Sequence, residues 1–198
     1  MFLKSNAVLI LFIISSWTTT INGTLFEFVL ENDEIFDACS EKPGNSGFHE
    51  VADLSELEID FDDGSIRVGG SAKMVWQDVQ STDRIDIKAE LLKFQRGTWQ
   101  PTMYSMRLHD FCSKQFDANS VWYKLWTSHI ADDDRKCINN YGHVYHHSPF
   151  NVDTISEFPN NMEGRHKIVV KMEAFDNMNV KRPKTYCYEI RGEFVKVK

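Results

Sequence analysis

Residues Trp99 to Cys112 read WQPTMYSMRLHDFC, and residues 113 to 130 read SKQFDANSVWYKLWTSHI. In the first part, apolar Tyr104, Met106 and Leu108 alternate with Ser105 and Arg107. This alternation predicts a strand with one buried face.

The apolar period changes after Cys112. Four residues then follow the spacing of one helix face: Trp122, Leu125, Trp126 and His129. This spacing predicts a short helix near 113–130, ended by the exposed run Asp132–Asp134. Cys137 follows closely enough to form a disulfide with Cys112, so we expect an aromatic helix held against a sheet.

Alternating apolar and polar residues also predict strands at 25–30, 57–62, 66–77, 85–91, 166–174 and 186–191. Weaker candidates, 142–147 and 150–158, are separated by Pro149. Asp63-Gly64 is a hairpin-turn signal, and Gly69-Gly70 indicates a bulge or a close backbone approach. Seven or eight short strands without a strand–helix–strand rhythm predict an all-β fold, a two-sheet antiparallel sandwich or cup. A closed barrel is the structural alternative.

The chain has 198 residues, of which 42% are hydrophobic, enough for one well-packed domain. Lys4 precedes a short apolar run at 7–14, and small polar residues follow up to Gly23. We therefore expect a signal peptide at 1–23 and a single secreted domain at 24–198. A membrane anchor is the alternative, but the run is much shorter than the ~20 residues that a spanning helix needs.

The net charge of −7 becomes −8 without the signal peptide, which carries one lysine and no acid. An acidic chain without a basic stripe is a poor candidate for binding nucleic acid. We interpret the cluster 181–184 (KRPK) as a solvated hairpin loop.

The four cysteines are Cys39, Cys112, Cys137 and Cys187. An even number in a secreted chain predicts two disulfides. No pair has C-x-x-C spacing, which argues against zinc. Three pairings remain open from the sequence alone.

Catalytic and metal-binding patterns are weak. We interpret five histidines, His109, His129, His143, His146 and His147, as ordinary surface residues, because on a strand His146 points away from His143 and His147. The run Asp132–Asp134 lacks the spaced ligands of a calcium loop, and Ser46 lies outside a G-x-S-x-G motif. We expect no enzyme activity, no metal and no cofactor.

A scattered set of residues resembles a known family: Trp99-x-Pro101, Asp110-Phe111-Cys112, Cys137, Gly142-x-x-Tyr145, Phe158-Pro159, Gly164-x-x-Lys167 and Cys187-x-Glu189-x-x-Gly192. In order and spacing it resembles the insect CheA/CheB chemosensory proteins. That family is similar to the ganglioside activator protein and, more distantly, to the ML lipid-recognition domain.

The resemblance implies a secreted β-cup with an apolar cavity, which binds lipids or hydrocarbon-like pheromones without catalysis in taste tissue. It also implies the pairs Cys39–Cys187 and Cys112–Cys137. The activator protein has further disulfides, which four cysteines cannot supply. A chemosensory receptor or ion channel is a further implied partner.

Aromatic residues make up 13% of the chain, which adds to the expectation of an apolar ligand or lipid between the sheets. The expected lining is Trp76, Ile87, Leu91, Tyr104, Met106, Trp122, Trp126, Ile168, Val170 and Met172. A secreted interaction module with a filled core, which modulates a receptor or channel, is the alternative. A hydrolase is a third and weaker hypothesis.

Overall fold

The computed structural model describes residues 23–32, 35–40, 46–62 and 65–198. The expected signal peptide, except Gly23, lies outside the described residues. So does the expected Asp63-Gly64 turn, although the strands on either side of it pair in antiparallel fashion as far as Asp62 and Ser65.

The larger of two sheets has seven strands, with the order β7-β6-β10-β11-β1-β9 and β2 paired to β11. Its strands are β1 (Thr24–Leu30), β2 (Asp37–Ala38), β6 (Arg84–Gln95), β7 (Thr98–Leu108), β9 (Ile155–Phe158), β10 (Gly164–Phe175) and β11 (Lys181–Lys196). We call it sheet one. All of its pairings are antiparallel.

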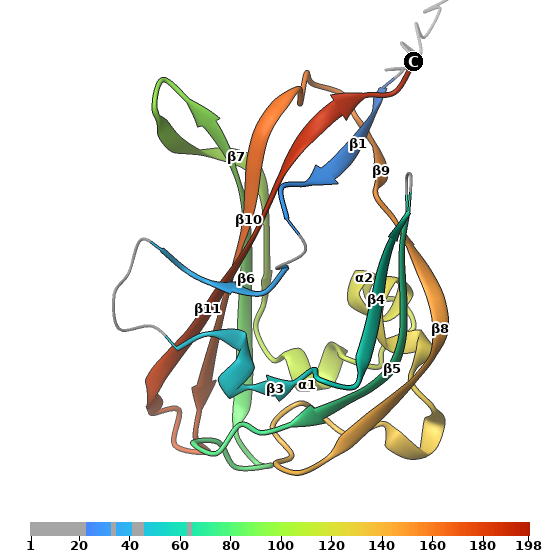
Figure 1. The fold of residues 1–198 in the computed structure, drawn as a ribbon. Helices are drawn as coiled ribbons and strands as arrows, with labels where there is room; N and C mark the ends of the chain where they lie inside the picture. Colours follow the sequence, from blue (N-terminus) through green and yellow to red (C-terminus); the bar gives the residue numbers. More distant parts are fainter. Residues whose placement is uncertain (1–22, 33–34, 41–45, 63–64) are drawn as a thin grey trace, which may run out of the picture.

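The smaller sheet has four strands, with β5 at its centre. They are β3 (Ala52–Asp53), β4 (Leu57–Asp62), β5 (Ser65–Met74) and β8 (Val144–Asp153), all antiparallel, and we call them sheet two. In Figure 1 the long strands of sheet one stand at the left and β4, β5 and β8 at the right. The predicted all-β fold of two antiparallel sheets is confirmed.

Strand β8 runs without a break through Pro149, where the sequence predicted two separate strands. The register between β5 and β8 shifts between Val68 and Gly70, which leaves Gly69, although paired with Glu58 of β4, without a partner on β8 beside Pro149. Because proline has no N–H to donate, a bulge is one of the few places where a sheet accepts it. The bulge predicted at Gly69-Gly70 is therefore confirmed, and it allows β8 to continue.

The predicted single helix near 113–130 is wrong in detail. The segment contains α1 (Phe111–Lys114), α2 (Val121–Leu125) and single 3₁₀ turns at Thr127–His129 and Asp132–Asp134. The backbone N–H of Asn119 donates to Asp117, and the hydroxyl of Ser120 caps a new helix at Tyr123. Such side chains compete with helical hydrogen bonds, so the chain turns and restarts.

Both disulfides pair as the resemblance implied, Cys39 with Cys187 and Cys112 with Cys137. Cys112–Cys137 joins the two ends of the helical segment. Cys187 alternates with inward-facing Tyr186 and Tyr188, yet it is buried, and its partner Cys39 directly follows β2, which pairs with β11 beside it.

The basic cluster 181–184 is not a solvated loop, as the sequence suggested, but the start of β11. Its three cations each pair with carboxylates: Lys181 with Glu173, Arg182 with Asp83, and Lys184 with Asp78 and Glu50. The cluster therefore fastens β11 to neighbouring segments and offers no free basic patch.

Two buried clusters of side chains pack on the inner face of sheet one. The base core lies at the end where β6 begins: Val51, Trp76, Val79, Ile85, Ile87, Phe111, Val170, Met172, Ala174, Tyr186 and Tyr188. The upper cluster lies at the other end: Phe26, Met162 and Phe194, with Phe28, Leu91, Tyr104 and Phe158 packed against them. A third cluster, which includes Ala72, Met74 and Tyr145, belongs to sheet two.

Candidate functional site

The inner face of sheet one carries seven of the ten residues expected to line a cavity. Strand register pairs Met172 with Ile87 and Ile168 with Leu91. Directly opposed residues share one face of a sheet. The same register places Val170 beside Ala89, and Met106 beside Ala89 from the other side. Tyr104 follows on β7, two residues from Met106.

Four of the expected lining residues belong to the base core. Trp76 is 1% exposed, with its ring 4.9 Å from that of Tyr186, and Ile87, Val170 and Met172 are also buried. The base of the interior is therefore filled by the protein's own side chains, and these four residues support the fold.

The other inner-facing residues are covered less completely. Leu91, Tyr104, Met106 and Ile168 are partly buried, and Met106 belongs to none of the three clusters. Along β6, burial thus decreases away from the base core, whereas on β10 partly buried Ile168 lies between buried Val170 and buried His166.

Sheet two also has an apolar face, and none of its residues is among the ten that were expected to line the cavity. Register aligns Phe61 with Ile66 and Ile59 with Val68, and then Val68 with Phe150 and Ile66 with Val152. Four of these residues, Ile59, Phe61, Ile66 and Val152, are partly buried or exposed and lie outside the three clusters of the described chain. In the sequence, the alternation of Leu57, Ile59 and Phe61 with acidic residues is the pattern from which this apolar face could have been predicted.

The helical segment connects the β7 edge of sheet one to the β8 edge of sheet two. Trp122 contacts Phe111, with ring centroids 5.5 Å apart, and lies against the base core. Trp126 contacts Phe150 and His147 of β8. The two indoles were expected on one helix face, but Trp126 ends α2 at φ −139° and ψ −62° and reaches a different partner. Both are half-buried.

The interior also holds unpartnered polar atoms. Three residues of the described chain have buried side-chain atoms there without a hydrogen-bond partner: Tyr104 (hydroxyl), His147 (both ring nitrogens) and His166 (Nε2). His147 is 6% exposed, so its interpretation as a surface histidine is wrong. Burial lowers the pKa of both histidines, which keeps them neutral near pH 7.

The remaining histidines of the predicted group are partly or largely exposed. His146 pairs with Asp134, and His109 with Asp86. His129 stacks on Phe150 with ring centroids 4.0 Å apart. The described residues contain no group of three or more side chains able to hold a metal ion.

Two pockets lie elsewhere. One, of about 500 Å³, is lined by residues that include Asn139, Asn140 and His143. The other, of about 480 Å³, is lined by residues that include Phe36, Phe48 and Leu54. None of the ten expected residues is among the described residues that line them.

Comparison with known proteins adds no assignment: no family model matches the chain, and neither does any curated protein. Within the described ranges, no helix has the length and apolar character needed to cross a membrane.

Proposed function

We propose that this protein is a secreted, non-enzymatic carrier that binds a long apolar molecule between the inner faces of its two sheets. The observation that carries the proposal is the incompletely covered apolar surface on both faces. Met106 on sheet one and Ile59, Phe61, Ile66 and Val152 on sheet two face inward, yet they belong to none of the buried clusters. Large apolar surfaces that the protein itself leaves uncovered are typical of binding sites.

A hydrocarbon chain suits this surface. Burying a methylene group contributes ~0.8 kcal/mol, so a chain of moderate length can offset the loss of its translational freedom. With no charge pair needed, affinity should rise with chain length and depend little on salt. Secretion accords with the two disulfides and with the expected signal peptide. The resemblance to chemosensory proteins supports a pheromone or related lipid as the cargo.

The second candidate is an interaction module with a filled interior, which acts on a receptor or channel. One observation favours it: Trp76, Ile87, Val170 and Met172 are completely packed in the base core. The two functions differ in whether an apolar molecule enters the folded protein.

The test is displacement of an environment-sensitive apolar probe by fatty alcohols and hydrocarbons of graded length. Strand β7 offers a matched pair of substitutions, Met106→Gln on the inner face and Met103→Gln at a position 76% exposed. We expect the inner substitution to weaken probe binding about 5- to 10-fold and the outer one to have little effect, because only the first puts a polar amide against the chain. Failure of the probe to enter the folded protein would favour the interaction module.

A further inference from the structure

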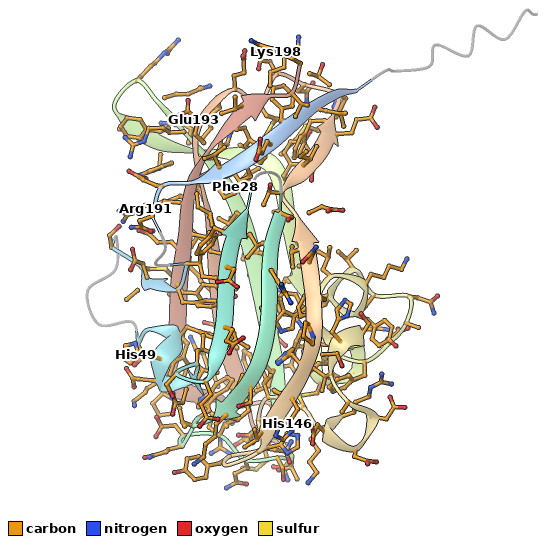
Figure 2. The ribbon with its side chains drawn as sticks, turned by 45° about the vertical axis from the view of Figure 1, so that its right-hand side comes forward. Phe28, His49, His146, Arg191, Glu193 and Lys198 are labelled. Carbon is orange, nitrogen blue, oxygen red and sulfur yellow. A yellow bond between two sulfur atoms is a disulfide. The ribbon has the colours of Figure 1, made fainter. Side chains whose placement is uncertain are left out.

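The hairpin formed by β6 and β7 extends beyond the rest of sheet one. The pairing of β6 with β10 ends at Lys93, whereas β6 and β7 continue to pair with each other up to the turn Arg96-Gly97. Both turn residues have positive φ, as the favoured two-residue hairpin turn requires. The turn stands at the same end of the molecule as the C-terminus, Lys198 (Figures 1 and 2). We call residues 92–103 the hairpin tip.

Large apolar side chains lie exposed on the hairpin tip. Register opposes Phe94 to Trp99, with their ring centroids 5.1 Å apart, and Leu92 to Pro101. Directly opposed residues share one face of a sheet, so these four form one apolar surface. It lies on the outer face, since the residue before Leu92 packs in the upper cluster. Phe94 is 36% exposed, and Met103, which follows on β7, is 76% exposed. Much of the apolar surface of the hairpin tip is therefore in contact with water.

The hairpin tip is basic, in contrast to the chain as a whole. It contains Lys93 and Arg96 and no acidic residue, whereas the full chain has a net charge of −7. Arg96 is exposed and forms no ion pair within the described residues. A further cation comes from β10: the guanidinium carbon of Arg165 lies 5.2 Å from the ring centroid of Phe94, and the same side chain pairs with Glu31. Positive charge therefore borders the apolar surface.

Apolar side chains bordered by cations suit the surface of an anionic bilayer. Aromatic and other apolar side chains lie at the boundary between headgroups and acyl chains, while Arg and Lys side chains reach the phosphate groups. An acidic protein would also complement the charge, but the binding energy of protein interfaces concentrates in well-packed pockets. Neither of the two pockets described above includes a residue of the hairpin tip. A protruding turn can enter a fluid surface without a pocket, so the observations favour the bilayer.

We propose that the hairpin tip docks the protein on bilayers that contain anionic lipids. Phe94, Trp99 and Met103 lie at the boundary of the acyl chains, and Arg96 and Arg165 lie against the phosphate groups. This inference goes beyond the carrier function and does not depend on it, because none of these five residues is among the ten expected to line a cavity. For a carrier, docking would bring the protein to a surface that takes up or releases an apolar cargo.

The test is co-sedimentation of the folded, disulfide-bonded protein with phosphatidylcholine vesicles that contain or lack phosphatidylglycerol. Two matched pairs of variants compare the hairpin tip with other surfaces. Met103→Gln has its control in Met178→Gln, at positions 76% and 77% exposed. Arg96→Gln has its control in Arg67→Gln, an exposed position on β5.

We expect binding only to vesicles that contain phosphatidylglycerol. Arg96→Gln should weaken it about 5-fold, the contribution of one cation near an anionic surface. Met103→Gln should weaken it by a similar factor, about 5-fold, because a polar amide replaces a buried apolar group. The two control variants should bind like the native protein, and added salt should weaken binding of all of them.

Three outcomes would overturn the proposal. Equal binding to both kinds of vesicle would show that anionic lipid is not recognised, and equal losses in tip and control variants would show that the hairpin tip is not the docking surface. Absence of binding to either vesicle would leave an acidic protein as the partner. Val29 on β1, 46% exposed, gives a further check. If Val29→Gln abolished vesicle binding while Met103→Gln did not, docking would occur through β1 and the assignment to the hairpin tip would be wrong.

Discussion

Tyr104 on β7 contacts Phe158 on β9, although these strands stand at opposite ends of the pairing order of sheet one. The contact requires the sheet to curl until its two edges approach each other. The same rings enclose Phe194 and complete the upper cluster. The curl therefore closes one end of the interior, and the base core closes the other.

The upper cluster should contribute strongly to stability. Phe194 is buried and contacts the rings of Phe28, Phe158 and His166. We expect Phe194→Ala to lower the free energy of unfolding by about 3–5 kcal/mol in urea denaturation, through lost burial and the cavity left behind. The control, Phe94→Ala, changes a side chain that is 36% exposed and should cost clearly less. Equal losses for the two variants would mean that the cluster does not hold the curl.

A buried ion pair fastens the outer side of sheet one. Nζ of Lys167 lies 3.1 Å from Oε2 of Glu189, both side chains are 1% exposed, and Arg191 and Ser40 also bind Glu189. Glu189→Gln should cost about 3–5 kcal/mol, because it replaces the carboxylate of a buried ion pair with a neutral amide. Exposed Glu193, two residues away and labelled in Figure 2, provides the control: Glu193→Gln should cost less than about 1 kcal/mol. A small loss at Glu189 would show that water reaches Lys167.

The two buried histidines predict a loss of stability in acid. Burial lowers the pKa of His147 and His166 from the ordinary value of 6.5. Around His147, His129 and His146 lower the pKa further, while the Gly70 carbonyl and Asp134 oppose the shift. The unfolded chain then binds more protons than the folded protein below about pH 6.5.

The stabilising effect of the two neutral histidines is thus complete above that pH and is lost as the pH falls toward the lowered values. Each histidine can contribute a slope of up to about 1.4 kcal/mol per pH unit. Denaturation between pH 7.5 and 5 should show the slope reduced in His147→Leu and retained in His49→Gln, which changes an exposed histidine that shifts the pKa of neither buried histidine. An unchanged slope in His147→Leu would contradict the assignment.

The disulfide Cys112–Cys137 should control ligand exchange as well as stability. It joins the ends of the segment that connects β7 to β8, and its cysteines are 25 positions apart in the sequence. Replacing both with Ala should cost about 3.5 kcal/mol by loop entropy and should speed release of a bound probe in stopped-flow measurements. Replacing Cys39 and Cys187 should cost about 5 kcal/mol, since that loop is longer, but should change probe release less. The reverse order of release rates would mean that the segment does not cover the site.

Most strands could be predicted because apolar and polar residues alternate within each of them, as in 57–62 and 166–174, and this pattern does not depend on the rest of the chain. The bulge could be predicted from Gly69-Gly70, but its partner could not, since Pro149 lies far along the chain and contacts it only in the folded sheet. The break in the helix could have been predicted from Asp117, Asn119 and Ser120, because the side chains of these residues favour turns and helix caps.

The site was predictable only in part. The alternating pattern identified Leu91, Met106 and Ile168, but it could not distinguish them from Val170 and Met172, which lie on the same face in the base core. Burial along one face depends on what the other sheet covers. The contact of Tyr104 with Phe158 depends on the curl of the sheet, and no local pattern encodes that curl.

Methyl NMR with a spin-labelled fatty alcohol tests the central claim most directly. If the chain lies between the sheets, the label should broaden the methyl resonances of Ile59, Leu91 and Ile168, on both inner faces. The methyls of Leu25 and Val29, exposed on β1, should stay sharp. Broadening confined to Leu25 and Val29, or none at all, would contradict a binding site between the sheets.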